Sequence, residues 1–378
     1  MLVNVLADEW LNTSLFLGRG MRHKSVRCGI SAANPITSPS MLANVSFSKM
    51  ATKRAFDDDR DKSVVLYSAG TTHITYNPQK QLGGGSFGKI FSGFASNAEP
   101  ELKYDVDIAV KLCRTGEVKE EALEQFNQEI KALEHMPSHP HIIDYFGHIN
   151  TCILFELGDC DLDEFLRFEA PLTTQQKHDI MQGIAAGMKH MDDWGVVHCD
   201  LKPHNIIMFG TTPKICDFGS SHIDGDAPLM YGGLCTSEYR APDILCYENN
   251  KLVPGQYSSA MMVWSFSFIL IQVWNHTPRT ILFNPEKSLD AYETKIRCQI
   301  YSLLCGRGYP ADSYQLQQMQ EYATSIEGRQ FRDNTMRMLF RMPICIADAI
   351  MSMWRFDNKQ RPTISKVVAM LGTVESWE

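Results

Sequence analysis

The chain has 378 residues, of which 44% are hydrophobic, so it is long enough to bury the core of one large domain or two smaller ones. Its formal net charge of −8 argues against a nucleic-acid-binding protein, which usually presents a basic face, so we expect no nucleic-acid partner. Its eleven cysteines include no Cys-x-x-Cys pair, which disfavours a disulfide framework or a zinc ribbon and favours a reducing, intracellular compartment such as the cytoplasm or nucleus.

Residues 1–72 have the composition of an extension without stable structure. The first 55 residues carry seven lysines or arginines and two acids, and they show no sustained hydrophobic period. The alternative is a transit peptide, because four basic residues cluster between Arg19 and Arg27. The residue order of a secretory signal is not found, and Met50 would serve as an alternative start.

Residues 81–91 indicate two strands joined by a glycine-rich turn, with Gly-x-Gly-x-x-Gly at Gly83, Gly85 and Gly88. Glycines let backbone amides approach phosphate oxygens because no Cβ stands in the way. The motif alone is weak evidence, since dinucleotide-binding folds also have it, followed there by a helix. Here an apolar strand follows, which favours a hairpin that covers phosphates.

Residues 107–112 have the apolar pattern of a strand, with one lysine, Lys111, embedded in it. A buried lysine needs a charged partner; the alternative is an edge strand whose lysine is solvated. Residues 117–136 show apolar side chains at helical spacing, and Glu129 lies beside that apolar face. Glu129 is therefore the candidate partner of Lys111.

The later part of the chain reads as mainly helical. Residues 152–157 indicate one more strand, and residues 173–194 a strongly amphipathic helix. The apolar run 258–274 is too short and too interrupted to span a bilayer, so it predicts a buried helix. Two further amphipathic helices are expected over 344–355 and 363–371.

One short loop combines an acid, a cation and an amide, at Asp200, Lys202 and Asn205. A second acid, Asp217, follows Asn205 by twelve residues. Phosphoryl transfer from a nucleotide needs such parts. One carboxylate orients the attacking hydroxyl and takes its proton, a lysine stabilises the transferred group, and a second carboxylate and an amide oxygen hold metal ions.

These motifs, in this order, resemble those of the eukaryotic-type serine/threonine protein kinases over about 300 of the 378 residues. Lys202, after Leu201, favours the serine/threonine branch over the tyrosine branch. The resemblance implies an α+β, bilobal protein-kinase fold. A small antiparallel β-sheet and one helix would form an N-lobe of residues 73–157, and a larger, mainly helical C-lobe would follow over 158–378. It also implies ATP and Mg²⁺ as cofactors and proteins bearing serine or threonine as substrates, and leaves the oligomeric state open.

The resemblance assigns catalytic roles to five residues. Asp200 would be the base, Lys202 would stabilise the moving phosphoryl group, and Thr236 would bridge these two. Lys111, fixed by Glu129, would position the nucleotide.

The resemblance also implies a metal site and a nucleotide site. Asn205 and Asp217 would hold Mg²⁺. Besides Lys111, the nucleotide would contact Leu82, Gly83, Gly84, Gly85, Ser86, Phe87, Gly88, Lys89, Ile90, Ala109, Glu156, Leu157 and Ile207.

Three positions depart from the family pattern. Cys199 replaces the arginine that gathers an activation-loop phosphate, which predicts that activity does not depend on that clamp. Met262 stands where the family has an aspartate that anchors the loop backbone, so another group must satisfy those amides. Asp243 replaces the glutamate that pairs with Arg361. Divergence confined to the scaffold would suit a fast-evolving, for instance viral, kinase.

Two alternatives stand beside the active protein kinase. A pseudokinase would bind nucleotide or protein without transferring a phosphoryl group, and the departures at Cys199 and Met262 motivate it. A small-molecule kinase of the aminoglycoside or choline type also has an acid followed by an asparagine, but Lys202 and the segment 236–243 argue against it.

Overall fold

The structure of the chain is a computed structural model. It describes residues 63–69, 72–84, 88–97, 104–113, 119–226, 236–241, 247–248, 251–252, 257–277, 289–303, 313–355 and 357–372, all within one compact unit of the chain. Residues 1–62 of the expected extension lie outside these ranges, and so do Gly85, Ser86 and Phe87 at the tip of the glycine-rich turn.

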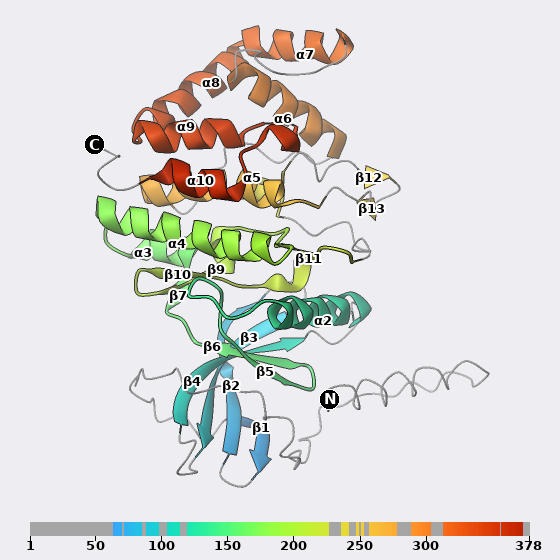
Figure 1. Ribbon diagram of the computed structural model, residues 1–378, viewed down its shortest axis with the longest axis vertical. Coiled ribbons are helices and arrows are strands. Elements are labelled where there is room, and N and C mark those ends of the chain that lie inside the picture. The colour runs from blue at the N-terminus through green and yellow to red at the C-terminus, as the bar shows by residue number, and fades with distance from the viewer. Residues whose placement is uncertain are drawn as a thin grey trace, which may run out of the picture. The chain divides into compact units, whose positions relative to one another are not determined.

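Six strands of the described chain form one antiparallel sheet in the order β1-β2-β3-β4-β6-β5 (Figure 1). From Phe91 onward, every second side chain of β3 is buried, as the two-residue period of a strand requires. Among these positions, Ala95 belongs to a buried apolar core that also contains Ile74, Ile108 and Leu154. The sheet starts at β1, ahead of the expected boundary at residue 73. The strands are β1 (Val64–Ala69), β2 (Thr72–Gly84), β3 (Gly88–Asn97), β4 (Tyr104–Cys113), β5 (Tyr145–Ile149) and β6 (Cys152–Glu156).

Strand β4 lies inside the sheet, between β3 and β6. Lys111 of β4 is opposite Ile90 on one side and Ile153 on the other. The edge-strand alternative for this lysine is therefore wrong, and a cation in a central strand requires a charged partner.

Helix α2 (Lys119–His135) lies between β4 and β5 in the chain and supplies that partner. Its side chains Ala122, Phe126 and Leu133 are buried, and Glu129 is buried beside them. The predicted helix over 117–136 is confirmed to within two residues at each end.

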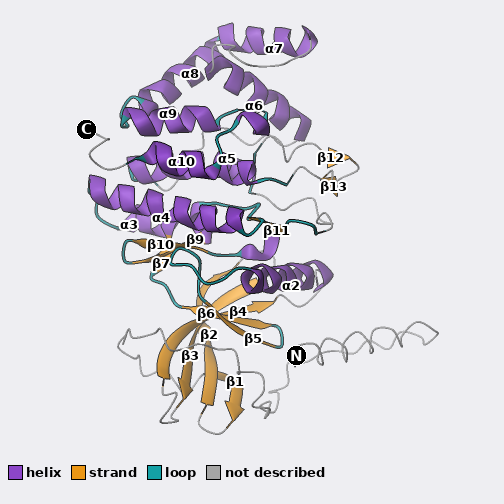
Figure 2. Cartoon of the chain, viewed as in Figure 1, coloured by secondary structure: helices purple, strands orange, loops and turns teal. Residues whose placement is uncertain are grey.

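The later part of the described chain is mainly helical (Figure 2). Helix α4 starts with a capping box formed by Thr173 and Gln176. Helix α5 is buried on all sides from Met261 to Val273, as its apolar sequence predicts. No helix among the described residues is both long enough and apolar enough to cross a bilayer. The helices are α3 (Leu162–Phe168), α4 (Thr174–Asp193), α5 (Ser259–Asn275), α6 (Leu289–Leu303), α7 (Ser313–Thr324), α8 (Ile326–Leu339), α9 (Ile344–Met353) and α10 (Ile364–Leu371).

Short ladders hold two loops against each other. β8 pairs with β11, and β9 pairs with both β7 and β10. Residues 198–205 connect β8 to β9, and residues 216–221 connect β10 to β11, so both ends of each loop are fixed by strand pairing. The strands are β7 (Cys160–Asp161), β8 (Val196–Val197), β9 (Ile206–Phe209), β10 (Thr212–Ile215) and β11 (His222–Ile223), with a separate pair β12 (Tyr247–Glu248) and β13 (Lys251–Leu252).

The fold predicted from the sequence is confirmed. An antiparallel sheet with α2 forms the smaller part, and the mainly helical residues after β6 form the larger part. This is the α+β, bilobal arrangement.

Candidate active site

Three ionisable side chains from three separate segments meet at one point. Lys111 Nζ donates to Glu129 Oε2 at 2.6 Å and to Asp217 Oδ1 at 2.6 Å. The Lys111 and Glu129 side chains are 15% and 2% exposed, whereas the Asp217 side chain is 46% exposed. The sheet, α2 and the loop after β10 therefore face the same site, and Asp217 is the member that solvent reaches.

Burial and charge oppose each other in this cluster. Burial favours the neutral form of Lys111, but the Asp217 and Glu129 carboxylates outweigh it and raise the pKa of its ammonium. Burial raises the pKa of Glu129, and Lys111 counters that rise. Burial also acts to raise the pKa of Asp217, but Lys111 outweighs it and the pKa is lowered. Lys111 is thus a permanent cation, and Asp217 is an anion at neutral pH.

A second cluster surrounds Asp200. Its Oδ1 accepts a hydrogen bond from the backbone N–H of Thr236 at 2.7 Å. Its Oδ2 accepts one from Lys202 Nζ at 2.6 Å, and the same ammonium donates to Thr236 Oγ1 at 2.7 Å. Thr236 therefore does bridge Asp200 and Lys202, at the position that the sequence predicts for it.

The two loops are locked together through Asn205 and His198. Asn205 Nδ2 donates to the backbone carbonyl of Asp200 at 2.9 Å, and the Asn205 carbonyl accepts from the Cys216 N–H at 2.9 Å. His198 Nε2 contacts the Cys216 carbonyl at 2.9 Å, and His198 Nδ1 accepts from the Asp200 N–H. Burial lowers the pKa of His198, so the imidazole is neutral and these bonds assign its proton to Nε2.

Two residues that flank this network adopt left-handed backbone conformations. Cys199 has a φ of +62° and Asp217 a φ of +65°, values that residues other than glycine rarely adopt. Such residues cost of order 1–3 kcal/mol each and persist only where the surroundings fix them. Phe218 is fully buried, and its ring centroid lies 5.2 Å from that of His198. This packing holds the neighbouring Asp217 backbone in its left-handed conformation.

The predicted nucleotide residues within the described ranges come from five strands and from Leu157, which follows β6. Four of these strands, β2, β3, β4 and β6, belong to the six-stranded sheet. Ile90 is the cross-strand neighbour of Lys111, and Ala109 is opposite Phe155 on β6. Leu82, Gly83 and Gly84 end β2, Gly88 and Lys89 begin β3, Glu156 ends β6, Leu157 follows it, and Ile207 is on β9. The structure thus places most of them on the sheet that carries Lys111, with Ile207 on a separate sheet and the tip of the turn outside the described residues.

Gly158, just after β6, makes a close approach to Ile207. A Cβ on Gly158 would lie only 2.1 Å from Ile207 Cγ2, so a side chain at this position is excluded. The chain after β6 is therefore packed directly onto β9.

A set of ion pairs at the end of β6 was not predicted from the sequence. Lys214 Nζ contacts Glu156 Oε1 at 2.5 Å and Asp144 Oδ2 at 3.0 Å. Glu156 Oε1 also accepts from the Asp144 N–H at 2.7 Å. The signal in the sequence is a lysine in a short apolar strand, the same signal that identified Lys111.

The side chains that would hold a metal ion fit a site shared with substrate phosphates. Asn205 uses its amide N–H groups on Asp200, which leaves its oxygen as a cation ligand, and Asp217 keeps an exposed carboxylate. Among the described residues no group of three or more His, Cys, Asp or Glu could hold a metal alone. One carboxylate and one amide oxygen suit Mg²⁺, which usually takes its other ligands from phosphates and water.

The departures from the family pattern have structural consequences. Cys199 is buried, so no side chain cation occupies that position. Met262 Sδ accepts the backbone N–H of His198 at 3.4 Å, so a thioether acts in place of the expected aspartate. Arg361 donates to the carbonyls of Arg355 and Ala260, while Asp243, its expected partner, lies outside the described residues.

Comparisons with known proteins agree with this geometry. The sequence model of the family described as "Protein kinase domain" matches residues 76–371. Mitogen-activated protein kinase homolog NTF6 of Nicotiana tabacum is 29% identical over 213 residues, which are 53% of each chain. Mitogen-activated protein kinase mpkA of Aspergillus fumigatus is 30% identical over 217 residues, 54% of this chain and 48% of that protein. Tyrosine-protein kinase hopscotch of Drosophila melanogaster is 27% identical over 220 residues, 56% of this chain and 18% of that protein. The chain spans about half the length of the mitogen-activated protein kinases that it matches.

Proposed function

The chain belongs to the protein kinase family, and we propose that it transfers the γ-phosphoryl group of Mg-ATP to serine or threonine hydroxyls of proteins. The observation that carries this proposal is the contact between Lys111 and Asp217, which are 106 residues apart in the chain. This contact brings the expected nucleotide residue of the sheet and the expected metal residue of the helical part to one site. We assign the activity to a domain that starts at β1 and to an intracellular, reducing setting.

In the proposed reaction, the substrate oxygen bonds to the γ-phosphorus, the bond to the β-γ bridging oxygen breaks, and the hydroxyl proton passes to Asp200. Three donors fix the Asp200 carboxylate in advance: the Thr236 N–H, Lys202 Nζ and Asn205 Nδ2. A carboxylate held in this way orients the hydroxyl without reorganising during the reaction. Lys202, beside Asp200, is placed to neutralise charge on the transferred group.

The chemistry that Mg²⁺ would supply is positive charge beside the phosphates. Asp217 and Asn205 would hold it, because their oxygens are the hard donors on either side of the interlocked loops. Lys111 carries a lasting positive charge, held by Glu129, that suits the α- and β-phosphates.

Two features support serine or threonine as the acceptor. Lys202 is the residue that distinguishes the serine/threonine pattern, and its ammonium is committed to Asp200 and Thr236. Thr236 holds Asp200 from the other side, so the base and its lysine form one unit.

The test is phosphate transfer from Mg-ATP to a generic protein substrate and to peptide libraries that carry serine, threonine or tyrosine. Asp200→Asn keeps the shape of the side chain but removes its charge and one of its two acceptor oxygens, and with them the base, so transfer should fall by about 100-fold or more. Asp193→Asn, in an exposed ion pair on α4, is the matched control and should transfer at the wild-type rate.

Three outcomes would count against the proposal. Equal transfer by Asp200→Asn and wild type would mean that the base is another residue. Thermal stabilisation by Mg-ATP without transfer in either protein would support the pseudokinase alternative. Transfer confined to the tyrosine library would overturn the serine/threonine assignment.

A further inference from the structure

Helix α2 presents a stripe of polar side chains to the chain that follows Asp217. Gln125, Gln128 and residue 131 are three apart, so they share one face of the helix. Gln125 lies 3.3–3.5 Å from the place that a Cβ on Gly219 would take. Gln128 Nε2 donates to the carbonyl of Ser221 at 2.9 Å. The stripe therefore follows the chain outward from Asp217, residue by residue.

The third member of the stripe forms an ion pair. Lys131 Nζ contacts Asp226 Oδ1 at 2.6 Å and Oδ2 at 2.7 Å, so one ammonium binds both carboxylate oxygens. The side chains are 55% and 25% exposed. Lys131 is two residues beyond Glu129, so this pair restrains the same turn of α2 that carries the partner of Lys111.

Asp226 is itself fixed to the chain that enters the loop of Asp200. The Asp226 N–H donates to the carbonyl of Ile223 at 3.0 Å, and Ile223 pairs with Val196 across the β8–β11 ladder. The neighbouring Asp224 N–H donates to the carbonyl of Gly195 at 2.8 Å. The negative charge that holds α2 therefore has a defined position relative to the base.

A kinase needs its lysine–glutamate pair in place, and a phosphate gathered by cationic side chains is one way to secure it. Here Cys199 is buried and uncharged where the arginine of that clamp would stand. We propose that Asp226 is a built-in replacement for the phosphate: by binding Lys131, it holds α2 in the position in which Glu129 reaches Lys111. Lys131 and Asp226 are then positioning residues, and this inference rests on the proposed kinase function.

The pair acts on the population of the competent conformation. An exposed ion pair contributes little free energy. The apparent affinity of a ligand that binds only the competent conformation is proportional to the fraction of chains in that conformation. Breaking the pair should therefore lower kcat/KM for ATP by about threefold to fivefold, which corresponds to about 0.6–1 kcal/mol. High salt should have a similar effect on the intact pair, because it screens exposed charges.

The experiment uses the full chain after phosphatase treatment, with two readouts. The first is kcat and KM for ATP at a saturating protein substrate, and the second is amide hydrogen exchange of residues 125–135 without nucleotide. Asp226→Asn and Lys131→Met should each lower kcat/KM and speed exchange in α2. The double variant Lys131→Asp with Asp226→Lys should recover most of both, because it rebuilds the pair with reversed charges. The exposed pair of Lys189 and Asp193 on α4 is the matched control, and Lys189→Met should change neither readout.

The inference is overturned if the single variants match wild type in exchange and in kcat/KM, or if the charge-exchanged double variant recovers neither. It is also overturned if phosphatase treatment alone lowers wild-type activity by tenfold or more, because a phosphate would then be required. A wild-type chain that transfers no phosphoryl group would contradict the proposed function, and the exchange measurement would still decide whether the pair holds α2.

Discussion

Met262 shows how a single residue can take over a structural task with different chemistry. The sequence predicts that the amides before Asp200 lose their aspartate acceptor and need another one. The structure gives that role to Met262 itself, whose Sδ accepts the His198 N–H at 3.4 Å. This could not be read from the sequence, because a thioether is a weak acceptor and its reach depends on how α5 packs beneath β8.

Met262→Leu tests this contact, because leucine keeps the volume and removes the acceptor. The buried His198 N–H would lose its partner, so we expect a loss of about 1 kcal/mol in the free energy of unfolding and a lower kcat, since His198 also holds Asp200. Urea unfolding and steady-state kinetics measure the two effects.

Met261 is the matched control, since it is the neighbouring buried methionine on the same helix. Met261→Leu changes packing in the same way without touching the His198 N–H. If the two variants lost equal stability and equal activity, the Sδ contact would have no role of its own.

At the scale of elements, the helices were the best-predicted features. The predicted helices over 173–194 and 258–274 differ from α4 and α5 by one residue at each end, and the one over 363–371 differs from α10 by one residue at its start. A strong amphipathic or continuously apolar pattern fixes such helices locally. The helices over residues 289–339 were not delimited from the sequence, and β1 was assigned to the extension, because these segments carry weaker patterns that tertiary packing completes.

The candidate site, like the fold, was only partly predictable from the sequence. The resemblance singled out Lys111, Glu129, Asp200, Lys202, Asn205 and Asp217 because their motifs have a recognisable order and spacing. The structure brings Lys111, Glu129 and Asp217 into contact, and likewise Asp200, Lys202 and Asn205. The pair of Lys131 and Asp226 was not found, because it joins a helix and a turn that are 95 residues apart. No local pattern states which face of α2 meets which residue of the later loop.

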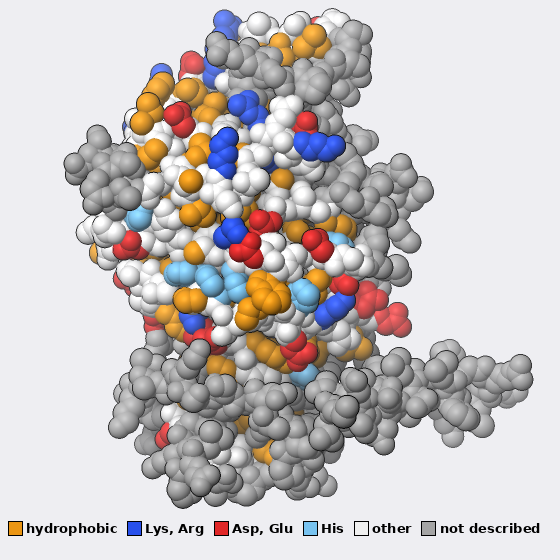
Figure 3. Space-filling view, in the orientation of Figure 1, with side chains coloured by type: hydrophobic (Ala, Val, Ile, Leu, Met, Phe, Trp, Pro, Cys, Tyr) orange, Lys and Arg blue, Asp and Glu red, His pale blue; other side chains and the backbone are white. Residues whose placement is uncertain are grey.

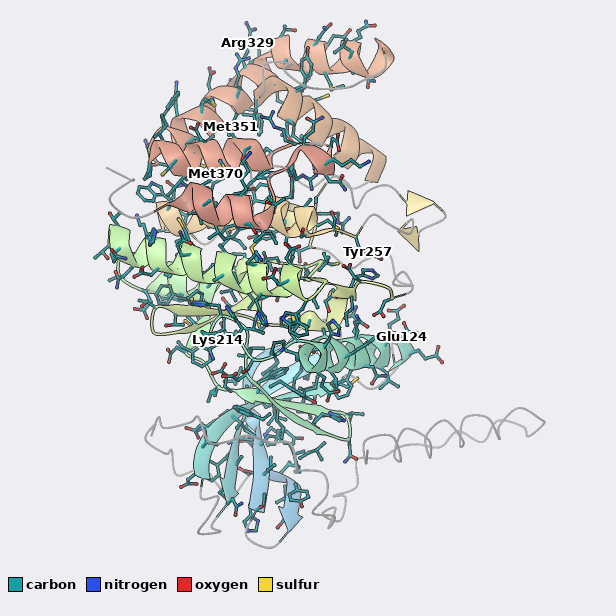
Figure 4. All side chains as sticks on the ribbon, in the orientation of Figure 1. Glu124, Lys214, Tyr257, Arg329, Met351 and Met370 are labelled. Atoms are coloured by element: carbon teal, nitrogen blue, oxygen red, sulfur yellow. The ribbon has the colours of Figure 1, made fainter. Side chains whose placement is uncertain are left out.

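The ion pairs at the end of β6 tie three elements together and can be tested as a unit. Figure 4 labels Lys214, which lies on β10. Its ammonium binds Glu156 at the end of β6 and Asp144 before β5. Lys214→Met would leave the buried Glu156 carboxylate without its cation, so we expect a loss of about 1–3 kcal/mol in the free energy of unfolding at pH 7.5.

The pH dependence of this loss identifies its cause. Burial already raises the pKa of Glu156, and Lys214 counters that rise, so removing Lys214 raises it further. A carboxyl with a raised pKa in the folded state costs stability only where the unfolded chain is ionised, so the loss should shrink as the pH falls toward 4.5. Urea unfolding of variant and wild type at pH 7.5 and pH 5 measures it, and a loss that does not change with pH would point to packing instead of charge.

At the scale of the whole molecule, a row of histidines lies where α2 and the chain after it meet the helical part (Figure 3). Their rings contact one another, with His139 stacked on His190 at 4.6 Å and inclined to His141 at 5.7 Å. Three of the row each contact a backbone carbonyl of another element at 2.9–3.0 Å: His135 to Trp194, His141 to Pro213 and His190 to Pro137. The row thus links segments on which the relative placement of Glu129 and Asp200 depends.

This row should make the stability of the molecule fall on mild acidification. Burial, aided by the neighbouring His190 and His141, lowers the pKa of His139 below its usual 6.5. The unfolded chain then binds a proton that the folded chain rejects, so stability is lost as the pH falls through about 6.5 toward the folded pKa. Burial lowers the pKa of His198 and His222 as well, so they add losses of stability of the same sign.

The variant His139→Asn tests this cause. It keeps an acceptor for the His141 N–H and cannot titrate, so its free energy of unfolding should drop less than that of wild type between pH 7.5 and pH 5.5. Urea unfolding of both proteins at the two pH values measures this difference. If the free energy of unfolding dropped equally in variant and wild type, His139 would take up its proton as readily in the folded state as in the unfolded chain.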